Sequence, residues 1–293
     1  MPNTAFSPKR ARIITRLALI AASLPAIVGS VLLMGSINVG NAWFMQILVA
    51  QFCIVLVFIL SSQKLDSPAL FTWLFGVAAL AIFATLIFAN GGAPHRWLSL
   101  GPVRLYVASA VLPVALLCLP QFLNQRNTVA ALWVAAIALL LAAQPDAAQV
   151  TAFSVAALYA FFCGTHSVRA KLIMTLFLAL CVLGAWWQPD PLESVAHVEG
   201  VLYLAFGAGR WALAIALLSL AIPVAVLIWL SQRVAHRGPI VVALYYAVIY
   251  AMTYAQITPV PLLGFGAGPL IGYFAMAIMA ERLNGATLTT TSK

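Results

Sequence analysis

Charged side chains are scarce in this chain of 293 residues: Asp, Glu, Lys and Arg together make up 7% of it, and Asp and Glu number only 6. Ordinary globular domains carry about 25% charged and about 45–50% apolar residues, whereas this chain is 64% hydrophobic. Such a composition excludes a water-soluble fold and indicates a polytopic membrane protein. The formal charge of +9 therefore does not indicate a nucleic-acid partner, because its meaning depends on where the basic residues lie relative to the membrane.

Several sequence patterns that carry chemistry are missing. The 4 cysteines form no CxxC pair and lie in apolar runs, so we expect packing residues and neither a disulfide framework nor a zinc site. The sequence has no HExxH, no phosphate-loop glycine pattern and no convincing internal repeat. No metal site and no certain cofactor are expected.

Apolar runs between loop signals predict ten membrane-spanning helices, since one span takes about 20 mainly apolar residues. The predicted spans are 15–36, 43–61, 68–89, 103–121, 128–143, 148–165, 170–187, 210–231, 239–257 and 263–281. We expect an all-α fold and one membrane domain over residues 1–293, with a basic tail at 1–14, the longest loop at 188–209 and a second tail at 282–293. The first span follows four basic residues but has no convincing cleavage site, so we expect it to be retained.

The basic residues predict an orientation. With an inside N-terminus, the inside-facing basic residues are Lys9, Arg10, Arg12, Arg16, Lys64, Arg126, Arg169, Lys171, Arg233, Arg237, Arg282 and Lys293. Only Arg96, Arg104 and Arg210 then face outside. This positive-inside bias predicts two cytoplasmic termini and an even number of spans. It also predicts attraction between the inner face and anionic membrane lipid.

Unusual polar residues concentrate in the predicted outside loops, beginning with residues 90–102. This stretch is too rich in Gly and Pro for a helix and places Arg96 beside Trp97. One interpretation is an interfacial anchor, with the indole at the level of the lipid headgroups and the guanidinium on a lipid phosphate. The other is a diphosphate clamp, because a guanidinium can donate two parallel hydrogen bonds to phosphate oxygens.

The second outside stretch is Gln144-Pro145-Asp146, where an apolar run stops just before the next one begins. An Asp at that position can cap the following helix, whose first amides are exposed and attract an anion. The functional interpretation is that Asp146 organises an outside cavity.

The third outside stretch, 188–200, contains three acids and one His within ten positions. His197 and Glu199 are two residues apart, so their side chains share a face if the chain is extended. A solvated loop without chemistry is one interpretation. The other is that a carboxylate at the membrane boundary acquires a raised pKa and acts as a general base.

Taken in order, these stretches resemble the SEDS family (shape, elongation, division and sporulation), which includes FtsW, RodA and SpoVE. The family's RW-x-x-x-G segment between spans three and four is similar to Arg96-Trp97-Leu98-Ser99-Leu100-Gly101, and its QPD after span five to Gln144-Pro145-Asp146. Its HTDF segment is similar to His197-Val198-Glu199-Gly200, with Glu in place of the catalytic Asp. Its segment before the last span is faintly echoed by residues 260–267.

The resemblance implies a peptidoglycan glycosyltransferase that polymerises lipid-linked disaccharide at the outer face of the bacterial cytoplasmic membrane, with a class B penicillin-binding protein as partner. It implies Glu199 as the general base and a substrate site that includes Arg96, Trp97 and Asp146. Arg96 would neutralise the diphosphate, with Arg210 as a second cation and His197 orienting Glu199 or holding substrate. A divalent cation bridging diphosphate and carboxylate is compatible with this chemistry.

Two alternatives stay open at the level of sequence. Where the family has Q-P-S-E at the top of span four, this chain has Tyr106-Val107-Ala108-Ser109, and the family's E-E-L-G segment is absent. These differences favour a SEDS-like protein without polymerase activity that acts as a partner or regulator of wall assembly, in cell shape or cell division. The third hypothesis is a lipid flippase or transporter, which usually carries ionisable residues near the middle of its spans.

Overall fold

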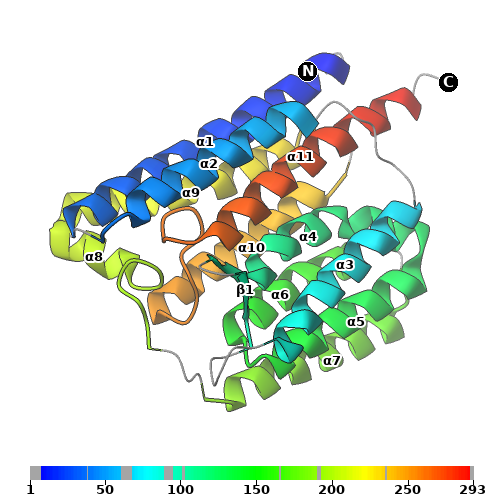
Figure 1. Ribbon diagram of the computed structural model, residues 1–293. Coiled ribbons are helices and arrows are strands. Elements are labelled where there is room, and N and C mark those ends of the chain that lie inside the picture. The colour runs from blue at the N-terminus through cyan, green and yellow to red at the C-terminus, as the bar shows by residue number, and fades with distance from the viewer. Residues whose placement is uncertain are drawn as a thin grey trace.

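The computed structural model describes residues 8–37, 39–60, 68–88, 95–100, 103–164, 166–189, 193–234 and 236–290 (Figure 1). Its elements in chain order are α1 (Pro8–Ser36), α2 (Ala42–Leu60), α3 (Pro68–Ile87), β1 (Trp97–Leu100), β2 (Val103–Tyr106), α4 (Val107–Gln125), α5 (Asn127–Ala143), α6 (Ala147–Cys163), α7 (Val168–Trp187), α8 (Val201–Ala208), α9 (Arg210–Ser231), α10 (Gly238–Met252), η1 (Thr253–Ala255) and α11 (Ala267–Thr290). The expected all-α class is confirmed, with one short β-hairpin added to it.

Within the described part of the chain, seven helices are long and apolar enough to cross a membrane: α1, α2, α3, α4, α7, α9 and α10. The outward faces of α1, α2, α3, α7 and α9 carry large apolar side chains. On α7 the exposed residues include Leu172, Leu176, Leu180 and Leu183. Exposure of such an apolar stripe is unfavourable in water and favourable against lipid tails. The chain is therefore a multi-pass membrane protein.

Several predicted boundaries are corrected by the structure. Residues 103–106, predicted to open the fourth span, form β2, because this Val-Arg-Leu-Tyr segment pairs with residues 97–100 in an antiparallel hairpin. Residues 201–208, predicted as part of the long loop, form α8. Parts of both predicted tails are helical, since α1 begins at Pro8 and α11 ends at Thr290. Hydropathy marks where the apolar run ends, whereas Lys, Arg and Leu continue a helix readily beyond it.

Other parts of the predicted tails and loops lie outside the described residues. These are residues 1–7, 291–293, 190–192 and the Gly-rich part of the first outside loop, 89–94 and 101–102.

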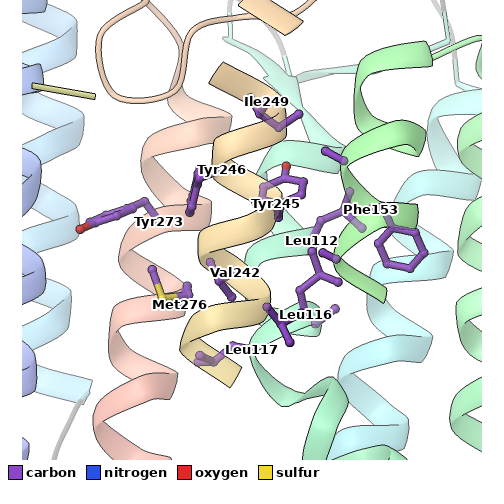
Figure 2. Packing of buried hydrophobic residues seen from close by; sticks show 14 of the residues in the cluster. Leu112, Leu116, Leu117, Phe153, Val242, Tyr245, Tyr246, Ile249, Tyr273 and Met276 are labelled. Atoms are coloured by element: carbon purple, nitrogen blue, oxygen red, sulfur yellow. The ribbon is translucent and has the colours of Figure 1, made fainter. Parts of the chain in front are cut away.

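Three helices form the centre of the bundle. Helix α4 packs against α3, α6, α10 and α11, and α11 in turn packs against α1 and α2, while α10 also contacts α6 and α9. Figure 2 shows the packed side chains where these helices meet, among them Leu112, Leu116 and Leu117 of α4, Phe153 of α6, Val242, Tyr245 and Ile249 of α10, and Tyr273 and Met276 of α11. All of these are buried, so the middle of the bundle is filled mainly by aliphatic and aromatic side chains.

Two glycines bring α11 directly onto the backbone at the start of α4. A Cβ at Gly272 would overlap the carbonyl oxygen of Ser109, and a Cβ at Gly268 would overlap that of Tyr106. The two glycines are four residues apart and therefore lie on one face of the helix. This small-residue spacing is the one that lets membrane helices approach closely. It fixes the hairpin, which leads into α4, relative to the C-terminal helix.

The bundle has two unlike ends. Helix α1 begins and α11 ends at the same end, which we call the basic end (Figure 1). There the Arg16 guanidinium donates to both carboxylate oxygens of Glu281, at 2.8 and 2.6 Å, joining α1 to α11. The opposite end, which we call the site end, carries the β1–β2 hairpin, α8 and the start of α6 (Figure 1).

Candidate functional site

A pocket with an empty volume of about 290 Å³ opens at the site end. Its lining comes from three separate parts of the chain: the hairpin, the turn before α8, and the segment after α10. The lining residues are Arg96, Trp97, Tyr106, Glu193, Ser194, Glu199, Gln256, Ile257 and Pro259. Arg96 and Trp97 of one predicted motif and Glu199 of another thus meet in one pocket.

The hairpin supplies one wall of this pocket. Trp97 and Tyr106 are partners in the register of β1 and β2, and their rings stack with centroids 5.1 Å apart. The Arg96 carbonyl accepts a hydrogen bond from the Val107 amide, which ties the hairpin to the first turn of α4. Because β1 pairs with β2, and β2 leads directly into α4, Arg96 and Trp97 have a defined position at the pocket.

Arg96 is buried, with 4% of its surface exposed. Its Nε donates to the Gln144 carbonyl at 3.5 Å and lies 4.0 Å from Oδ2 of Asp146, and its Nη2 donates to the Pro145 carbonyl. A side chain so enclosed does not extend to lipid headgroups, so the interfacial-anchor interpretation of Arg96 is wrong. The guanidinium is held instead between the pocket and the Gln-Pro-Asp turn.

Asp146 performs two structural tasks at once. Its Oδ1 accepts the Gln149 amide at 3.2 Å, which confirms the predicted cap of the following helix, α6. Its Oδ2 accepts the Tyr106 hydroxyl at 2.6 Å and faces Arg96. Burial, together with the Asp146 charge, raises the pKa of Tyr106 well above its ordinary value, so its hydroxyl stays protonated and donates. Asp146 does not line the pocket, but it supports two residues that do.

Gln144 fastens the same turn to α3. Its buried Nε2 donates to the Ile82 carbonyl at 2.8 Å and to the Thr85 hydroxyl. The Thr85 hydroxyl in turn donates to the His95 carbonyl, directly before Arg96. The Arg-Trp and Gln-Pro-Asp motifs are therefore joined by a continuous hydrogen-bonded path through α3.

Glu199 lies in a tight turn that forms the wall of the pocket facing the hairpin. The Val195 carbonyl accepts the amides of Val198, Glu199 and Gly200, and Oε2 of Glu199 accepts the Val195 amide at 2.9 Å. Glu199 is 9% exposed, so its carboxylate is largely enclosed yet borders the pocket. The His197 and Glu199 side chains would share a face in an extended chain, but the backbone forms a turn here, so this arrangement is not adopted.

The segment after α10 clamps this turn from behind. The Val260 amide donates to the Val198 carbonyl at 3.2 Å, and the Phe265 amide donates to the His197 carbonyl at 2.8 Å. A Cβ at Gly264 would overlap the Val198 carbonyl, so this approach requires glycine. The segment that only faintly echoes the family motif thus positions the backbone around Glu199.

A glutamine of α2 completes the clamp. Gln46 is 1% exposed; its Nε2 donates to the Gly264 carbonyl at 3.2 Å, and its Oε1 accepts the Gly266 amide at 3.4 Å. One amide side chain therefore satisfies both a donor and an acceptor of the same loop.

Replacing Gln46 by leucine is expected to loosen this clamp. The buried Gly264 carbonyl and the partly buried Gly266 amide lose their partners, and a buried group left unsatisfied costs about 1–3 kcal/mol. Hydrogen exchange followed by mass spectrometry should show faster exchange in residues 195–200 and 259–266 than in the wild type. The matched control is Gln51→Leu on the exposed face of the same helix, which should leave exchange unchanged. Equal exchange in all three proteins contradicts a clamping role for Gln46.

Two of the predicted site residues do not reach the pocket. His197 packs its ring against Phe265, with centroids 6.0 Å apart, and partial burial lowers its pKa below the ordinary value, so it is neutral at pH 7. Arg210 is exposed at the first residue of α9. Neither residue lines the pocket, so neither brings positive charge to it.

Sequence reasoning missed Tyr106, Glu193, Ser194 and Gln256 as lining residues. Tyr106 was not predicted as a lining residue because its segment was predicted to open the fourth span. Its place in an alternating Val-Arg-Leu-Tyr segment is nevertheless typical of a strand. The sequence around Gln256 contains no comparable signal. Gln256 follows η1 in a left-handed conformation (φ 57°). Its Oε1 accepts a hydrogen bond from the Ser194 hydroxyl at 2.7 Å. That bond joins the end of α10 to the Glu199 segment.

Neither a scan against models of known protein families nor a search of curated proteins finds a match to this chain. Among the described residues, no group of three or more His, Cys, Asp and Glu side chains is placed to hold a metal ion. What the pocket offers is one guanidinium, an indole, and two carboxylates, those of Glu193 and Glu199.

Proposed function

We propose that this chain is a SEDS-like membrane protein of peptidoglycan assembly. In this proposal it polymerises lipid-linked disaccharide into glycan strands, with Glu199 as the general base. The observation that supports the proposal is the meeting of Arg96, Trp97 and Glu199 around one pocket, with Asp146 directly behind Arg96. Arg96 and Glu199 are 103 positions apart in the chain. Of the sequence observations, only the resemblance to the SEDS family predicts that these residues are neighbours.

The proposed chemistry is a glycosyl transfer. The hydroxyl oxygen of the acceptor sugar attacks the anomeric carbon of the donor, its proton passes to the Glu199 carboxylate, and the bond to the lipid diphosphate breaks. Arg96 stabilises the negative charge that develops on the departing diphosphate. Trp97 offers an apolar face for a sugar ring. A divalent cation carried by the diphosphate would meet Glu193 and Glu199, since hard cations prefer carboxylate oxygens.

The proposed membrane arrangement has ten spans, obtained by adding α5, α6 and α11 to the seven long apolar helices. Helices α5 and α6 have 17 residues each and so measure about 26 Å, at the short end of what crosses a bilayer. The positive-inside rule puts the basic end, and with it both termini, in the cytoplasm. The pocket then faces the outside of the bacterial cytoplasmic membrane, where a class B penicillin-binding protein is the proposed partner.

A second candidate is a non-catalytic partner or regulator of wall assembly. The observation that favours it is the engagement of Arg96: its guanidinium already faces two carbonyl oxygens and Asp146. With His197 and Arg210 outside the lining, Arg96 is the cation that the described pocket has for a diphosphate.

A flippase or transporter receives less support. Such a protein needs a polar passage between the two faces of the membrane, whereas buried apolar side chains of α4, α6 and α10 fill the bundle between its ends (Figure 2).

Glycan polymerisation by the purified protein tests the proposal. The protein is reconstituted in nanodiscs with fluorescent lipid-linked disaccharide, with and without class B penicillin-binding proteins. Glu199→Gln is expected to lower the rate of polymerisation about 100-fold or more, because loss of a general base costs about 10²–10⁴-fold. The matched control is Glu193→Gln, the other carboxylate of the pocket, which should reduce the rate far less.

The outcome separates the two candidates. If wild type makes no polymer while binding the precursor, and an authentic SEDS enzyme is active in parallel, the enzyme proposal fails. The partner role is then tested in cells, where it predicts that Glu199→Gln leaves envelope assembly intact.

A further inference from the structure

A second and larger pocket lies at the basic end, with an empty volume of about 960 Å³. Its lining comes from the last turn of α4, the last turn of α6 and the connection that leads into α10. The lining residues are Pro120, Gln121, Leu123, Asn124, Ala160, Cys163, Gly164, His236 and Arg237. None of them belongs to the site described above.

The two pockets are well separated. Helix α4 runs from one to the other, with Tyr106 at the first pocket and Gln121 at the second. Fifteen residues of α-helix span about 22 Å, which is most of the apolar thickness of a bilayer. The side chains between them are those of the apolar core in Figure 2, so the second pocket has its own opening and its own chemistry.

Arg237 is the charged group of this pocket. Its Nη1 donates to the Cys163 carbonyl at the end of α6, at 2.9 Å. That bond fixes the guanidinium at the pocket while occupying one of its five N–H groups. Such a fixed planar group suits an anion with several oxygens, since it can donate in parallel to two of them.

His236 and Gln121 add further hydrogen-bonding groups to this pocket. His236 is 7% exposed, and its Nδ1 accepts the Gly238 amide at 3.2 Å, so the neutral ring carries its proton on Nε2. Oε1 of Gln121 is buried and has no hydrogen-bond partner among the described residues. A buried amide oxygen in that state favours a ligand that brings a donor, such as a hydroxyl group.

The charge around the pocket has one sign. None of the described lining residues is acidic, and the described acid of this end, Glu281, is paired with Arg16 on α1 and α11. Arg126, Arg169 and Lys171 lie at the same end, in or next to the connections that follow α4 and α6. An anionic ligand is therefore attracted to this end.

We propose that this pocket binds a phosphate group with a hydroxyl nearby, of the glycerol phosphate type. Arg237 binds the phosphate oxygens, and Gln121 accepts the hydroxyl. Two sources share this chemistry: the headgroup of phosphatidylglycerol in the surrounding leaflet, and water-soluble glycerol 3-phosphate. The proposal is independent of the chemistry at Glu199, because no residue is common to the two pockets.

Native mass spectrometry of the full chain, released from delipidating detergent, tests the site. Phosphatidylglycerol, phosphatidic acid, phosphatidylcholine, glycerol 3-phosphate and inorganic phosphate are the probes. Arg237→Gln is expected to weaken phosphatidylglycerol binding about 10-fold or more, equivalent to about 1.4 kcal/mol. The matched control is Arg233→Gln, at the same end but outside the pocket, where the guanidinium lies over the Trp229 ring at 4.7 Å; its binding should stay within about 2-fold of wild type.

A second variant addresses the hydroxyl. Gln121→Leu leaves the charge unchanged and should remove the preference for phosphatidylglycerol over phosphatidic acid, which lacks the glycerol hydroxyls. Tight binding of glycerol 3-phosphate that also depends on Arg237 supports the site and identifies the soluble source. Equal phosphatidylglycerol binding by wild type and Arg237→Gln overturns the proposal, and so does an equal loss in Arg237→Gln and Arg233→Gln.

Discussion

Replacing Asp146 by alanine is expected to destabilise the protein by about 3–5 kcal/mol, because it leaves the buried Arg96 guanidinium without its carboxylate. The same change removes the acceptor of the Tyr106 hydroxyl and the cap of α6. Thermal unfolding in detergent measures the effect, followed with a thiol-reactive dye. Cys53, Cys118 and Cys181 are buried and report unfolding, while the exposed Cys163 is first replaced by serine.

Two further variants separate the ion pair from the cap. Asp146→Asn keeps an oxygen for the Gln149 amide and loses the charge, so it should be destabilised less than Asp146→Ala. Combining it with Arg96→Gln should cost less than the two single changes added together, because the double variant leaves no unpaired charge. Strict additivity of the two changes contradicts an energetic link between Arg96 and Asp146.

Gly272→Ala is the second substitution that is expected to destabilise the protein strongly. The added methyl group would overlap the Ser109 carbonyl and crowd the backbone of Ala110, and backbone cannot yield as a flexible side chain does. Overpacking of this kind costs about 1–3 kcal/mol and occasionally more. Separation of α11 from α4 would also displace the hairpin, so both the yield of folded protein and its melting temperature should fall.

Gly184→Ala is the matched control for this prediction. Gly184 lies on α7, and a Cβ there would meet no atom within 4 Å. Alanine forms helices better than glycine by about 0.8–1.0 kcal/mol per residue, so this variant should be as stable as wild type or more so. If both alanine variants have the melting temperature of the wild type, the close packing of α11 on α4 is not what stabilises the bundle.

Hydropathy was sufficient to predict the long apolar helices and the multi-pass class, because each apolar run must be covered by lipid or by neighbouring helices. The β1–β2 hairpin could not be found that way. Its Val-Arg-Leu-Tyr strand adjoins the apolar start of α4 and was read as one continuous span. Helix α8 was not predicted either, because eight residues are too few for a clear helical periodicity of apolar residues.

The positions that line the pocket were indicated where a motif concentrates unusual residue types, as at Arg96 and Glu199. Contacts made by common residues were not. Gln46 and Gln256 are isolated polar residues among apolar neighbours, and their roles depend on loops more than 60 positions away in the sequence. The spacing of His197 and Glu199 left their relative placement open, because it depends on the local backbone; the Val195 carbonyl accepts three amides and so forms a turn.

The clamp on the Glu199 turn bears on how the protein is made. Synthesis proceeds from the N-terminus, so Gln46, Arg96 and Asp146 enter the membrane long before the segment that holds the His197 and Val198 carbonyls. A nascent chain that has not yet delivered Val260 and Phe265 has no means of fixing Glu199 against Arg96. Assembly of the pocket is therefore postponed until the segment after α10 has been made, and a chain truncated directly after η1 would carry every predicted site residue yet lack the clamp that completes the site.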